Sequence, residues 1–346
     1  MRAVVFAGGG RVRVDDVAEP SLRERDDVLV RVSLSAICGS DLHLLHGKTP
    51  GMRAGGIIGH EFVGEVVAAG TDASSVQVGD RVLGSFLIAC GTCAACRVSR
   101  FNFCEHRRAL GLGELMGDLD GAQAEYVRVP AGDVNLMPVD QSLSDERALF
   151  AGDILTTGLY GAHLTEAAEG ATVVVIGAGP VGLCAALALR RRGARTIVVD
   201  TDAARTEWAT TNLGLESIGG AQHPDDVVAE LTNGTKADLA LDAVGAVAAL
   251  KTAIRCVRAG GRVVVLGVYG AERMELSMGR AWVNGLDLRF AGMANIQAHW
   301  AEALEAVRRG EIDPTALITH RLSLDDAEEG YELFQSRKAL KVVLAP

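Results

Sequence analysis

The stretch VVVIGAGPVGLCAALAL, residues 173–189, joins an apolar run to a glycine-rich turn and then to a segment rich in Ala and Leu. The turn has G-x-G-x-x-G spacing, and its residues are Gly177, Gly179, Pro180, Val181 and Gly182. In this motif the first glycine turns tightly, the second lets the backbone approach a pyrophosphate, and the third lets helix and strand pack closely. The stretch therefore predicts a strand, a phosphate-binding turn and a helix whose N-terminal amides face an anion.

An acidic residue ends the next apolar run, TIVVD, at Asp200. In that place a carboxylate would accept hydrogen bonds from both ribose hydroxyls of a dinucleotide. The glycines alone could equally form an ordinary tight turn, so the acid strengthens the prediction. An acid also repels a 2′-phosphate, and the nearby Arg205 is better placed along the adenosine ribose. We therefore predict NAD rather than NADP as the cofactor.

Strand and helix patterns alternate around this motif, from about residue 153 to 293. The expected strands are 171–176, 196–200, 237–242, 262–267 and 286–291, with helical segments at 180–192 and 247–259. Such alternation predicts a mostly parallel, doubly wound sheet. The run 173–189 could be read as a short membrane span, but its glycines and proline favour a buried strand and helix.

The rest of the chain has a different pattern. Residues 1 to about 150 contain short β-branched runs at 28–32, 62–68, 81–86 and 124–129, separated by Gly, Asp and Pro turns. This is typical of an all-β, barrel-like domain. Residues 294–346 show helical stretches at 298–309 and 324–336 and a closing strand at 339–344, which should rejoin one of the sheets. A chain of 346 residues is also long enough for two domains.

The composition excludes some classes of partner. The chain has 34 Lys and Arg against 44 Asp and Glu, a net charge of −10, with no block of like charge. Such a surface repels phosphate backbones and anionic lipid, so we expect neither nucleic acid nor a membrane as a partner. The N-terminal residues MRAVVFAGGG do not resemble a signal peptide. Together with seven cysteines, this favours a reducing compartment, the cytoplasm.

Four cysteines cluster in the segment CGTCAACRVSRFNFC. Their spacing is C-x2-C-x2-C-x7-C, and they are Cys90, Cys93, Cys96 and Cys104. Four thiolates can enclose a tetrahedral zinc ion and leave no open position for a substrate. Disulfides or free thiols fit a reducing compartment less well, and the spacing matches neither common ferredoxin pattern. We therefore predict a structural zinc site. The helical residues Cys184 and Cys256 are interpreted as buried hydrophobic residues.

Chemistry on a substrate requires a second centre with an open position. Cys38 in ICGSDLHLLHG and His60 in GHEFVGEVVAAG lie in glycine-flanked turns next to predicted strands. A thiolate and an imidazole are good zinc ligands, but a pair alone is a modest signal. Taken singly, a cysteine or histidine near a strand end more often contributes to packing.

Both turns resemble those of one family, the zinc-containing alcohol dehydrogenases of the medium-chain dehydrogenase/reductase superfamily. GHE at 59–61, followed by Gly64 and Gly70, is similar to its zinc signature, and CGSDLH at 38–43 resembles its first-ligand turn. The resemblance spans nearly the whole chain. It implies an α/β protein with a GroES-like β-barrel catalytic domain and a Rossmann domain, which is a doubly wound parallel sheet. The expected catalytic domain is 1–152, completed by 294–346, and the expected NAD-binding domain is 153–293.

The resemblance also implies the ligands of a catalytic zinc, and hence two zinc ions per chain. They are Cys38, His60 and a third residue just before a T-G-x-x-G-A stretch, where this sequence has Asp153 in GDILTTGLYGA. Cysteine is the third ligand in alcohol dehydrogenase, so Asp153 is a departure, one that resembles the formaldehyde-dehydrogenase-like branches. Glu61 is a further candidate ligand. The alternative for Asp153 is a helix N-cap, because it precedes an apolar helical run.

A proton relay and cofactor contacts follow from the same resemblance. The relay runs from the substrate oxygen to Ser40, to the nicotinamide ribose, to His43 and to water, because a hydroxyl passes a proton and an imidazole releases it near neutral pH. The alternative is that Ser40 caps the next helix and that His43 is a surface residue. Val268 in GVY is expected to meet the nicotinamide, and Lys341 to reach the pyrophosphate.

The implied function is a zinc- and NAD-dependent interconversion of an alcohol and an aldehyde or ketone by hydride transfer. The alternatives are a polyol, sugar, cyclitol or formaldehyde-type dehydrogenase of the same superfamily, and a non-catalytic nucleotide-binding relative. Pocket positions of the family give apolar candidates, Phe86, Val268, Leu115 and Met116, and polar ones, His46, Lys48, Thr49, Asn295, Gln297 and His299. The polar set favours a polar or polyfunctional alcohol as substrate. We also expect a homodimer or homotetramer, because the strand 286–291 would otherwise be an open edge.

Overall fold

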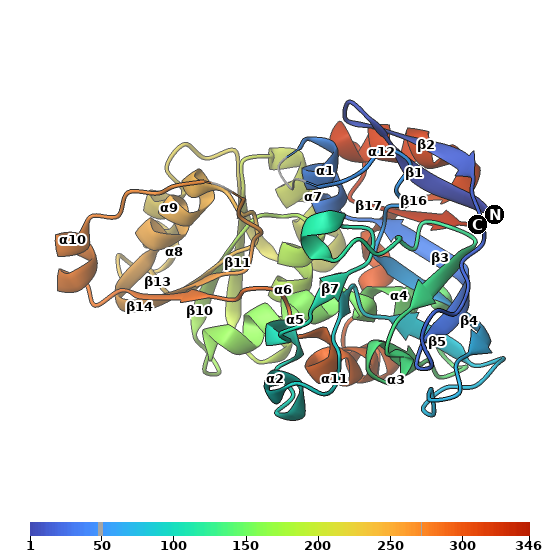
Figure 1. Cartoon of the computed structure of the whole chain (residues 1–346). Coiled ribbons are helices and arrows are strands. Elements are labelled where there is room, and N and C mark those ends of the chain that lie inside the picture. The colour runs from blue at the N-terminus through green and yellow to red at the C-terminus, as the bar shows by residue number, and fades with distance from the viewer. Residues whose placement is uncertain (48–50, 271) are drawn as a thin grey trace. The chain divides into compact units, whose positions relative to one another are not determined.

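The computed structural model of the chain describes residues 1–47, 51–270 and 272–346 (Figure 1). The chain forms two compact units. Unit 1 comprises residues 1–156 and 295–346, and unit 2 comprises residues 157–294. The division falls inside helix α5 (Ile154–Thr165), so Asp153 belongs to unit 1. The expected boundary at residue 153 is therefore displaced by a few residues, because the turn Phe150–Gly152 packs against strands of unit 1.

Unit 1 is built on a seven-stranded sheet with the order β16-β17-β3-β4-β5-β9, in which β8 also pairs with β3. The strands are β3 (Val28–Ile37), β4 (Glu61–Ala69), β5 (Arg81–Gly84), β8 (Tyr126–Val129), β9 (Leu136–Pro138), β16 (Ile318–Ser323) and β17 (Lys341–Ala345). In β3 the side chains of Val28, Val30 and Val32 are buried in the core, whereas Arg31 and Ser33 are exposed. This alternation is what a sheet with one covered face requires.

The two ends of the chain pack together within unit 1. A hairpin, β1 (Arg2–Gly8) with β2 (Arg11–Asp16), contacts helix α12 (Ala327–Gln335), and Figure 1 shows α12 beside β2. The closing strand β17 lies between β16 and β3, so it does rejoin a sheet of the first half of the chain. The smaller elements of unit 1 are β6 (Leu87–Ile88), β7 (Arg108–Ala109), α1 (Gly39–Leu45), α2 (Ala94–Arg97), α3 (Gly132–Asn135), α4 (Asp145–Leu149) and α11 (Ile296–Arg308).

Unit 2 contains a six-stranded parallel sheet with the order β12-β11-β10-β13-β14-β15. The strands are β10 (Thr172–Ile176), β11 (Arg195–Asp200), β12 (Glu216–Gly219), β13 (Ala237–Asp242), β14 (Val257–Val265) and β15 (Asp287–Phe290). The order reverses between β10 and β13, as in a doubly wound sheet, where ligands bind beside the carboxyl ends of the strands. The predicted parallel sheet is therefore confirmed, with β15 at its edge.

Most helices of unit 2 pack against this sheet. They are α6 (Pro180–Arg191), α7 (Ala203–Leu213), α8 (Pro224–Leu231) and α9 (Val247–Cys256), together with most of α5. The short helix α10 (Met278–Val283) has no buried residue. Helices α6 and α7 pack on β10 to β12, and α9 packs on β10, β13 and β14 (Figure 1). Right-handed crossovers that leave the centre of the sheet in opposite directions place these two sets on opposite faces.

Some predicted bounds are wrong for a physical reason. The helical pattern 247–259 ends at Cys256, and β14 already begins at Val257, which pairs with Ala237 before a register shift. The charged and glycine residues at 258–261 hide this bulged start of the strand. The hairpin β1–β2, strand β12 and helices α7 and α8 were not predicted. The stretch 173–189 forms strand β10 and helix α6, and among the described residues we find no helix long and apolar enough to cross a membrane.

Candidate active site

The first part of the site lies where β3 ends and α1 begins. Cys38 is the N-cap of α1, and the carboxylate of Asp41 accepts a hydrogen bond from the Cys38 backbone N–H at 2.9 Å. Ser40 lies inside the helix, so it is not the cap that the alternative interpretation required. His43 lies further along the same short helix and is half-buried. Helix α1 thus carries Cys38, Ser40 and His43 close together in the fold.

The second part lies at the start of β4, in the GHE turn. Gly59 has a φ of +88°, and a Cβ there would lie 2.3 Å from the side chain of Gln123. Only glycine therefore suits this position. The turn places His60 and Glu61 in the interior, with exposures of 2% and 0%. Both side chains lie with Cys38 and Asp153 in one group whose ligand atoms are all within 4.8 Å of one another.

The spacing of these atoms matches a tetrahedral metal ion. Asp153 Oδ2 lies 3.4 Å from His60 Nε2 and 3.7 Å from Cys38 Sγ. Zinc bonds of about 2.1 Å to nitrogen and oxygen and about 2.3 Å to sulfur place such atoms about 3.4 and 3.6 Å apart in a tetrahedron. The His60 ring is oriented for this, because its Nδ1 lies 3.2 Å from Asp41 Oδ1 and its Nε2 faces the other ligands. Cys38, His60 and Asp153 therefore fit a divalent zinc ion.

The electrostatics of the group also favour a cation. Burial raises the pKa of the Cys38 thiol, and the carboxylates of Asp153 and Glu61 raise this pKa further. Burial alone would lower the pKa of His60, but Asp41, Asp153 and Cys38 raise it well above its usual value. A cluster of acidic ligands that is removed from water holds protons tightly unless a metal ion takes their place.

Two further side chains complete the surroundings of His60. The Ser40 hydroxyl lies 3.1 Å from His60 Nε2, which places it on the metal-facing side of the ring. The Phe86 ring meets the imidazole edge-on, with ring centroids 6.0 Å apart. Ser40 therefore lies where a relay would need it, and Phe86 forms an apolar wall of the site.

Glu61 has a partner that the sequence did not indicate. Its Oε1 accepts a hydrogen bond from Lys341 Nζ at 2.5 Å, and both residues are buried. Burial alone would lower the pKa of Lys341, but Glu61 and Cys38 raise it, so the ammonium group stays charged. Glu61 Oε2 is buried and has no hydrogen-bond partner among the described residues, which leaves it available to a cation. The prediction that Lys341 reaches the pyrophosphate is corrected, because its Nζ is engaged by Glu61 in the interior of unit 1.

The four clustered cysteines form a separate group, with their sulfur atoms within 4.8 Å of one another. None of the seven cysteines, all of which lie among the described residues, forms a disulfide bond. The sulfurs of Cys93 and Cys96 are 3.5 Å apart, near the separation of about 3.8 Å expected around tetrahedral zinc. Burial raises the pKa of the Cys90 thiol, but N–H donors of the loop outweigh this and lower it to about 6. The group fits a closed zinc site. Cys184 and Cys256 are buried in helices, as predicted.

The glycine motif of unit 2 follows β10 directly. Gly177 has a φ of +108°, and a Cβ there would lie 2.8 Å from Val244, whereas a Cβ on Gly182 would lie 2.0 Å from the Gly177 carbonyl. A Cβ on Gly179, in contrast, would meet nothing within 4 Å. Close contacts within the protein thus require glycine at positions 177 and 182. Gly179 instead leaves open space in front of the N-terminus of α6. Pro180 and Val181 form the first turn of that helix.

Asp200, at the end of β11, is held in place by the same turn. Its carboxylate accepts hydrogen bonds from the backbone N–H groups of Ala178 at 2.7 Å and Asp202 at 2.9 Å. Asp202 caps α7, and Arg205 lies in the first turn of that helix, with its Nε 4.0 Å from Asp202. Val268, after β14, is 57% exposed. An acid is therefore fixed beside the glycine loop, as a site for a ribose requires.

Several predicted substrate contacts have other roles. Asn295 Nδ2 donates to the Ser99 carbonyl, and Gln297 Nε2 donates to the Leu87 carbonyl and to Asn135. These amides tie α11 to neighbouring loops, so the polar set gives less support to a polyfunctional alcohol than we expected. Leu115 is 66% exposed. His46 is also exposed, whereas His299 and Met116 are half-buried and remain predictions. Lys48 and Thr49 lie outside the described residues.

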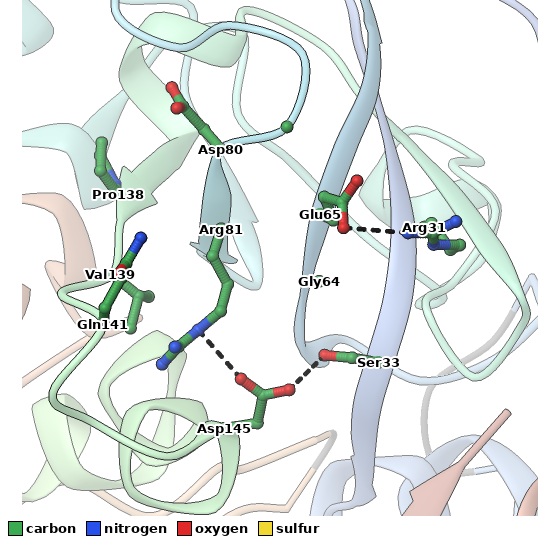
Figure 2. A pocket seen from close by; sticks show the side chains of 11 residues that line it. Arg31, Ser33, Gly64, Glu65, Asp80, Arg81, Pro138, Val139, Gln141 and Asp145 are labelled. Atoms are coloured by element: carbon green, nitrogen blue, oxygen red, sulfur yellow. Dashed lines mark hydrogen bonds and ion pairs between the residues drawn. The ribbon is translucent and has the colours of Figure 1, made fainter.

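A hollow of about 580 Å³ lies elsewhere in unit 1 (Figure 2). Most of its charged side chains are paired within the hollow, and Asp80 instead accepts a hydrogen bond from the Gln77 backbone N–H. Arg81 and Ser33 both reach Asp145, at 3.0 and 2.5 Å, and Arg31 pairs with Glu65 at 2.9 Å. No residue of the two metal groups lines it, so this hollow does not belong to the site.

The residues that sequence reasoning missed are Asp41, Gln123 and Tyr331. Tyr331 donates to Gln123 Oε1 at 2.9 Å, and Gln123 Nε2 lies 3.3 Å from Asp41 Oδ2. A signal for Asp41 existed, because an acid three residues after Cys38 can satisfy the N-cap backbone and orient a ligand histidine. Gln123 and Tyr331 are distant in sequence from every motif, so no local pattern identifies them.

Comparison with known proteins agrees with this geometry. The family model of the alcohol dehydrogenase GroES-like domain matches residues 24–140, and that of the zinc-binding dehydrogenase domain matches residues 180–309. An uncharacterized zinc-type alcohol dehydrogenase-like protein of Bacillus subtilis (strain 168), AdhB, is 33% identical over the full length of both chains.

Solved structures resemble the chain along its whole length. The alcohol dehydrogenase TADH from Thermus sp. ATN1 is 44% identical, with a TM-score of 0.95 over 100% of this chain and 99% of that one. A protein from Sinorhizobium meliloti 1021, solved with bound NADP, is 29% identical, with a TM-score of 0.85 over 100% and 99% of the two chains. The chain belongs to the zinc-containing alcohol dehydrogenase family of the medium-chain dehydrogenase/reductase superfamily, a family of oxidoreductases.

Proposed function

We propose that the chain binds two zinc ions and uses one of them, with NAD, to interconvert an alcohol and an aldehyde or ketone by hydride transfer. Cys38, His60 and Asp153 would hold the catalytic ion, and the four clustered cysteines would hold the structural one. The observation that carries the proposal is the spacing of 3.4 and 3.7 Å around Asp153 Oδ2, which matches a tetrahedral ion. These three protein ligands would leave the fourth coordination position of the ion open to a substrate. Glu61 Oε2 would compete with the substrate for that position.

A zinc ion bound there supplies a Lewis acid that lowers the pKa of an alcohol hydroxyl. The chain's own residues then have to remove the proton. Ser40 Oγ lies on the metal-facing side of His60, within 3.1 Å of Nε2, so it can accept the hydroxyl proton. His43 lies on the same helix and is half-exposed, so its imidazole can release that proton near neutral pH. Phe86 packs edge-on against the His60 ring and supplies apolar surface beside it.

The cofactor that we propose is NAD. Asp200 is anchored beside the glycine loop by two backbone N–H groups, and its remaining lone pairs suit two ribose hydroxyls. A 2′-phosphate at that place would face the same carboxylate and also Asp202, the N-cap of α7. Arg205 is the cation of this turn, and it pairs with Asp202. The NADP of the Sinorhizobium meliloti protein makes this a point to test.

A homodimer formed through unit 2 is the assembly that we propose. Strand β15 is the edge of the six-stranded sheet, and an unpaired edge is a template for another strand. Next to it, α10 exposes Met278 (71%), Trp282 (83%) and Val283 (74%), and β15 exposes Phe290 (67%). A second copy related by a two-fold axis would cover both the strand edge and these apolar side chains. Seven cysteines, none of which forms a disulfide bond among the described residues, further support a reducing location, which we propose to be the cytoplasm.

The test is a screen of alcohols and carbonyl compounds with NAD, NADH, NADP and NADPH, followed by absorbance, on wild type and on Asp153→Ala. We expect turnover that prefers NAD and NADH, and a loss of about a thousandfold in kcat for Asp153→Ala, because the metal ion supplies several kcal/mol to the transition state. Product analysis separates an alcohol dehydrogenase from polyol, sugar and formaldehyde-type enzymes. Full activity of Asp153→Ala, or no turnover of any compound by a wild type that holds one zinc, would reject the proposal.

A further inference from the structure

A chain of buried polar side chains connects the C-terminal helix α12 to the metal ligand His60. Tyr331 of α12 donates its hydroxyl proton to Gln123 Oε1 at 2.9 Å. Gln123 Nε2 lies 3.3 Å from Asp41 Oδ2, and Asp41 Oδ1 lies 3.2 Å from His60 Nδ1. Tyr331 is 2% exposed, and Gln123 and Asp41 are 0% exposed. The four residues come from segments far apart in the sequence, so only the folded chain brings them together.

The polarity of this chain is fixed by groups that can only accept or only donate. Gln123 Nε2 also donates to the Ala36 carbonyl at 3.0 Å, and a carbonyl accepts only. The amide therefore turns its NH2 group toward Ala36 and Asp41 and its oxygen toward Tyr331, which makes Tyr331 the donor. Asp41 Oδ2 accepts from the Cys38 backbone N–H and from Gln123. Asp41 Oδ1 has no hydrogen-bond partner among the described residues and lies 3.2 Å from His60 Nδ1, as an ion-pair contact.

The backbone around Gln123 is arranged for this contact. Its N–H donates to the Ile58 carbonyl at 3.0 Å, and its own carbonyl accepts from the Val4 N–H at 2.8 Å. The side chain then passes through the space that a Cβ on Gly59 would fill, with a contact of 2.3 Å. Gly59 thus has a second role in addition to forming the turn. Because it has no side chain, it leaves room for Gln123 to reach Asp41.

We infer that Gln123 and Tyr331 are positioning residues, which hold Asp41 so that His60 keeps its proton on Nδ1 and offers Nε2 to the metal ion. A ligand histidine that donates its other N–H to a carboxylate has a defined tautomer and ring orientation. Here the carboxylate itself needs two donors to stay in place, and one of them is Gln123. Tyr331 acts through Gln123, since without its hydroxyl the buried Oε1 loses its donor.

This inference rests on the proposed function, because it requires a metal ion at Cys38, His60 and Asp153. The experiment measures the release of zinc from the full-length, zinc-loaded protein to an excess of chelator, with a chromogenic indicator. Cys38→Ser identifies the release phase that belongs to this site, and the phase of the four cysteines serves as the internal reference. We compare Tyr331→Phe, Gln123→Met and their double variant.

We expect release from the His60 site to be about 10- to 100-fold faster in Gln123→Met and about threefold to tenfold faster in Tyr331→Phe. The effects of the two substitutions should be less than additive in the double variant, because Tyr331 and Gln123 act on the same carboxylate, Asp41. The release phase of the four cysteines should not change. Tyr160→Phe is the matched control, since it removes a hydroxyl that donates to the Ala291 carbonyl in unit 2.

A second readout is the visible spectrum of cobalt substituted at the His60 site, whose bands report ligand geometry. We expect these bands to shift in Gln123→Met and in Tyr331→Phe but not in Tyr160→Phe. Equal release rates and spectra in wild type and variants would overturn the inference and leave the proposed function intact. Fully additive effects of Tyr331→Phe and Gln123→Met would overturn it as well. Faster release of zinc from both the His60 site and the four-cysteine site in these variants would also overturn the inference. It would show that Gln123 and Tyr331 only support the fold as a whole. A wild type without a second zinc would instead reject the proposed function.

Discussion

Replacing Lys341 by methionine tests the buried ion pair beside the metal ligands. Lys341 Nζ and Glu61 Oε1 are 2.5 Å apart, and the residues are 1% and 0% exposed. At that distance two unit charges attract by about 7 kcal/mol with an effective dielectric constant of about 20. In the wild type, much of this attraction offsets the cost of removing the two charges from water. In the variant, Glu61 would remain buried without its partner and would keep its own desolvation cost. Lys341→Met should therefore lower the free energy of unfolding by about 3 to 5 kcal/mol.

Urea denaturation of the zinc-loaded protein, followed by circular dichroism, measures this change. The double variant Glu61→Gln/Lys341→Met removes both charges and should recover most of the loss, because no uncompensated charge remains. Lys251→Met is the matched control, since Lys251 is exposed on α9 and should change stability by less than about 0.5 kcal/mol. A Lys341→Met protein as stable as wild type, or a double variant as unstable as the single one, would refute the reasoning.

Three further predictions follow from the other sites. Cys104→Ser should lower the zinc content from two ions per chain to one and reduce the melting temperature, because a hydroxyl does not replace a thiolate; unchanged zinc content would contradict this. Asp200→Asn removes a charge but keeps an acceptor for the Ala178 N–H. The ratio of kcat/KM for NAD to kcat/KM for NADP should therefore fall about tenfold or more. An unchanged ratio would show that Asp200 does not select NAD. The pKa of Asp133 is lowered to about 2, because hydrogen bonds from Ser74 and Ser75 outweigh its burial. A carboxylate whose pKa is lowered stabilises the folded state at pH values above its unfolded pKa of about 3.9, and this stabilisation is lost as the pH falls toward 2. Asp133→Asn should therefore lower the free energy of unfolding by about 1 kcal/mol at pH 7 and by progressively less between pH 4 and pH 2. A loss of stability that does not vary with pH would contradict this.

Local spacing made part of this protein predictable. The G-x-G-x-x-G turn is predictable because Gly177 and Gly182 meet backbone and side chains of their own neighbourhood. The four cysteines are close together in sequence, and their loop brings them together in space. Five strands and two helices of unit 2 were found for the same reason, since each carries its own periodicity, whereas β12, α7 and α8 were missed. The bulged start of β14 was not found, because charged residues and glycines interrupt that periodicity.

The environment of the catalytic ligands depends on contacts between distant segments. Lys341 was expected at a pyrophosphate, but strand order places β17 beside β3, and its first residue then meets Glu61 at the start of β4. In the same way the barrel brings Gln123 and Tyr331 to Asp41. A pattern in one segment cannot indicate which distant side chain will neutralise a buried charge. Resemblance indicated the candidate ligands, and the structure was needed to show which residues surround them.

The most direct test of the central claim is an anomalous-difference map of the crystallised protein, recorded on the two sides of the zinc absorption edge. We predict two zinc peaks per chain, one among Cys90, Cys93, Cys96 and Cys104 and the other within about 2.0 to 2.3 Å of Cys38 Sγ, His60 Nε2 and an Asp153 oxygen. A single peak at the four cysteines, with the Asp153 carboxylate turned away from His60, would contradict the account.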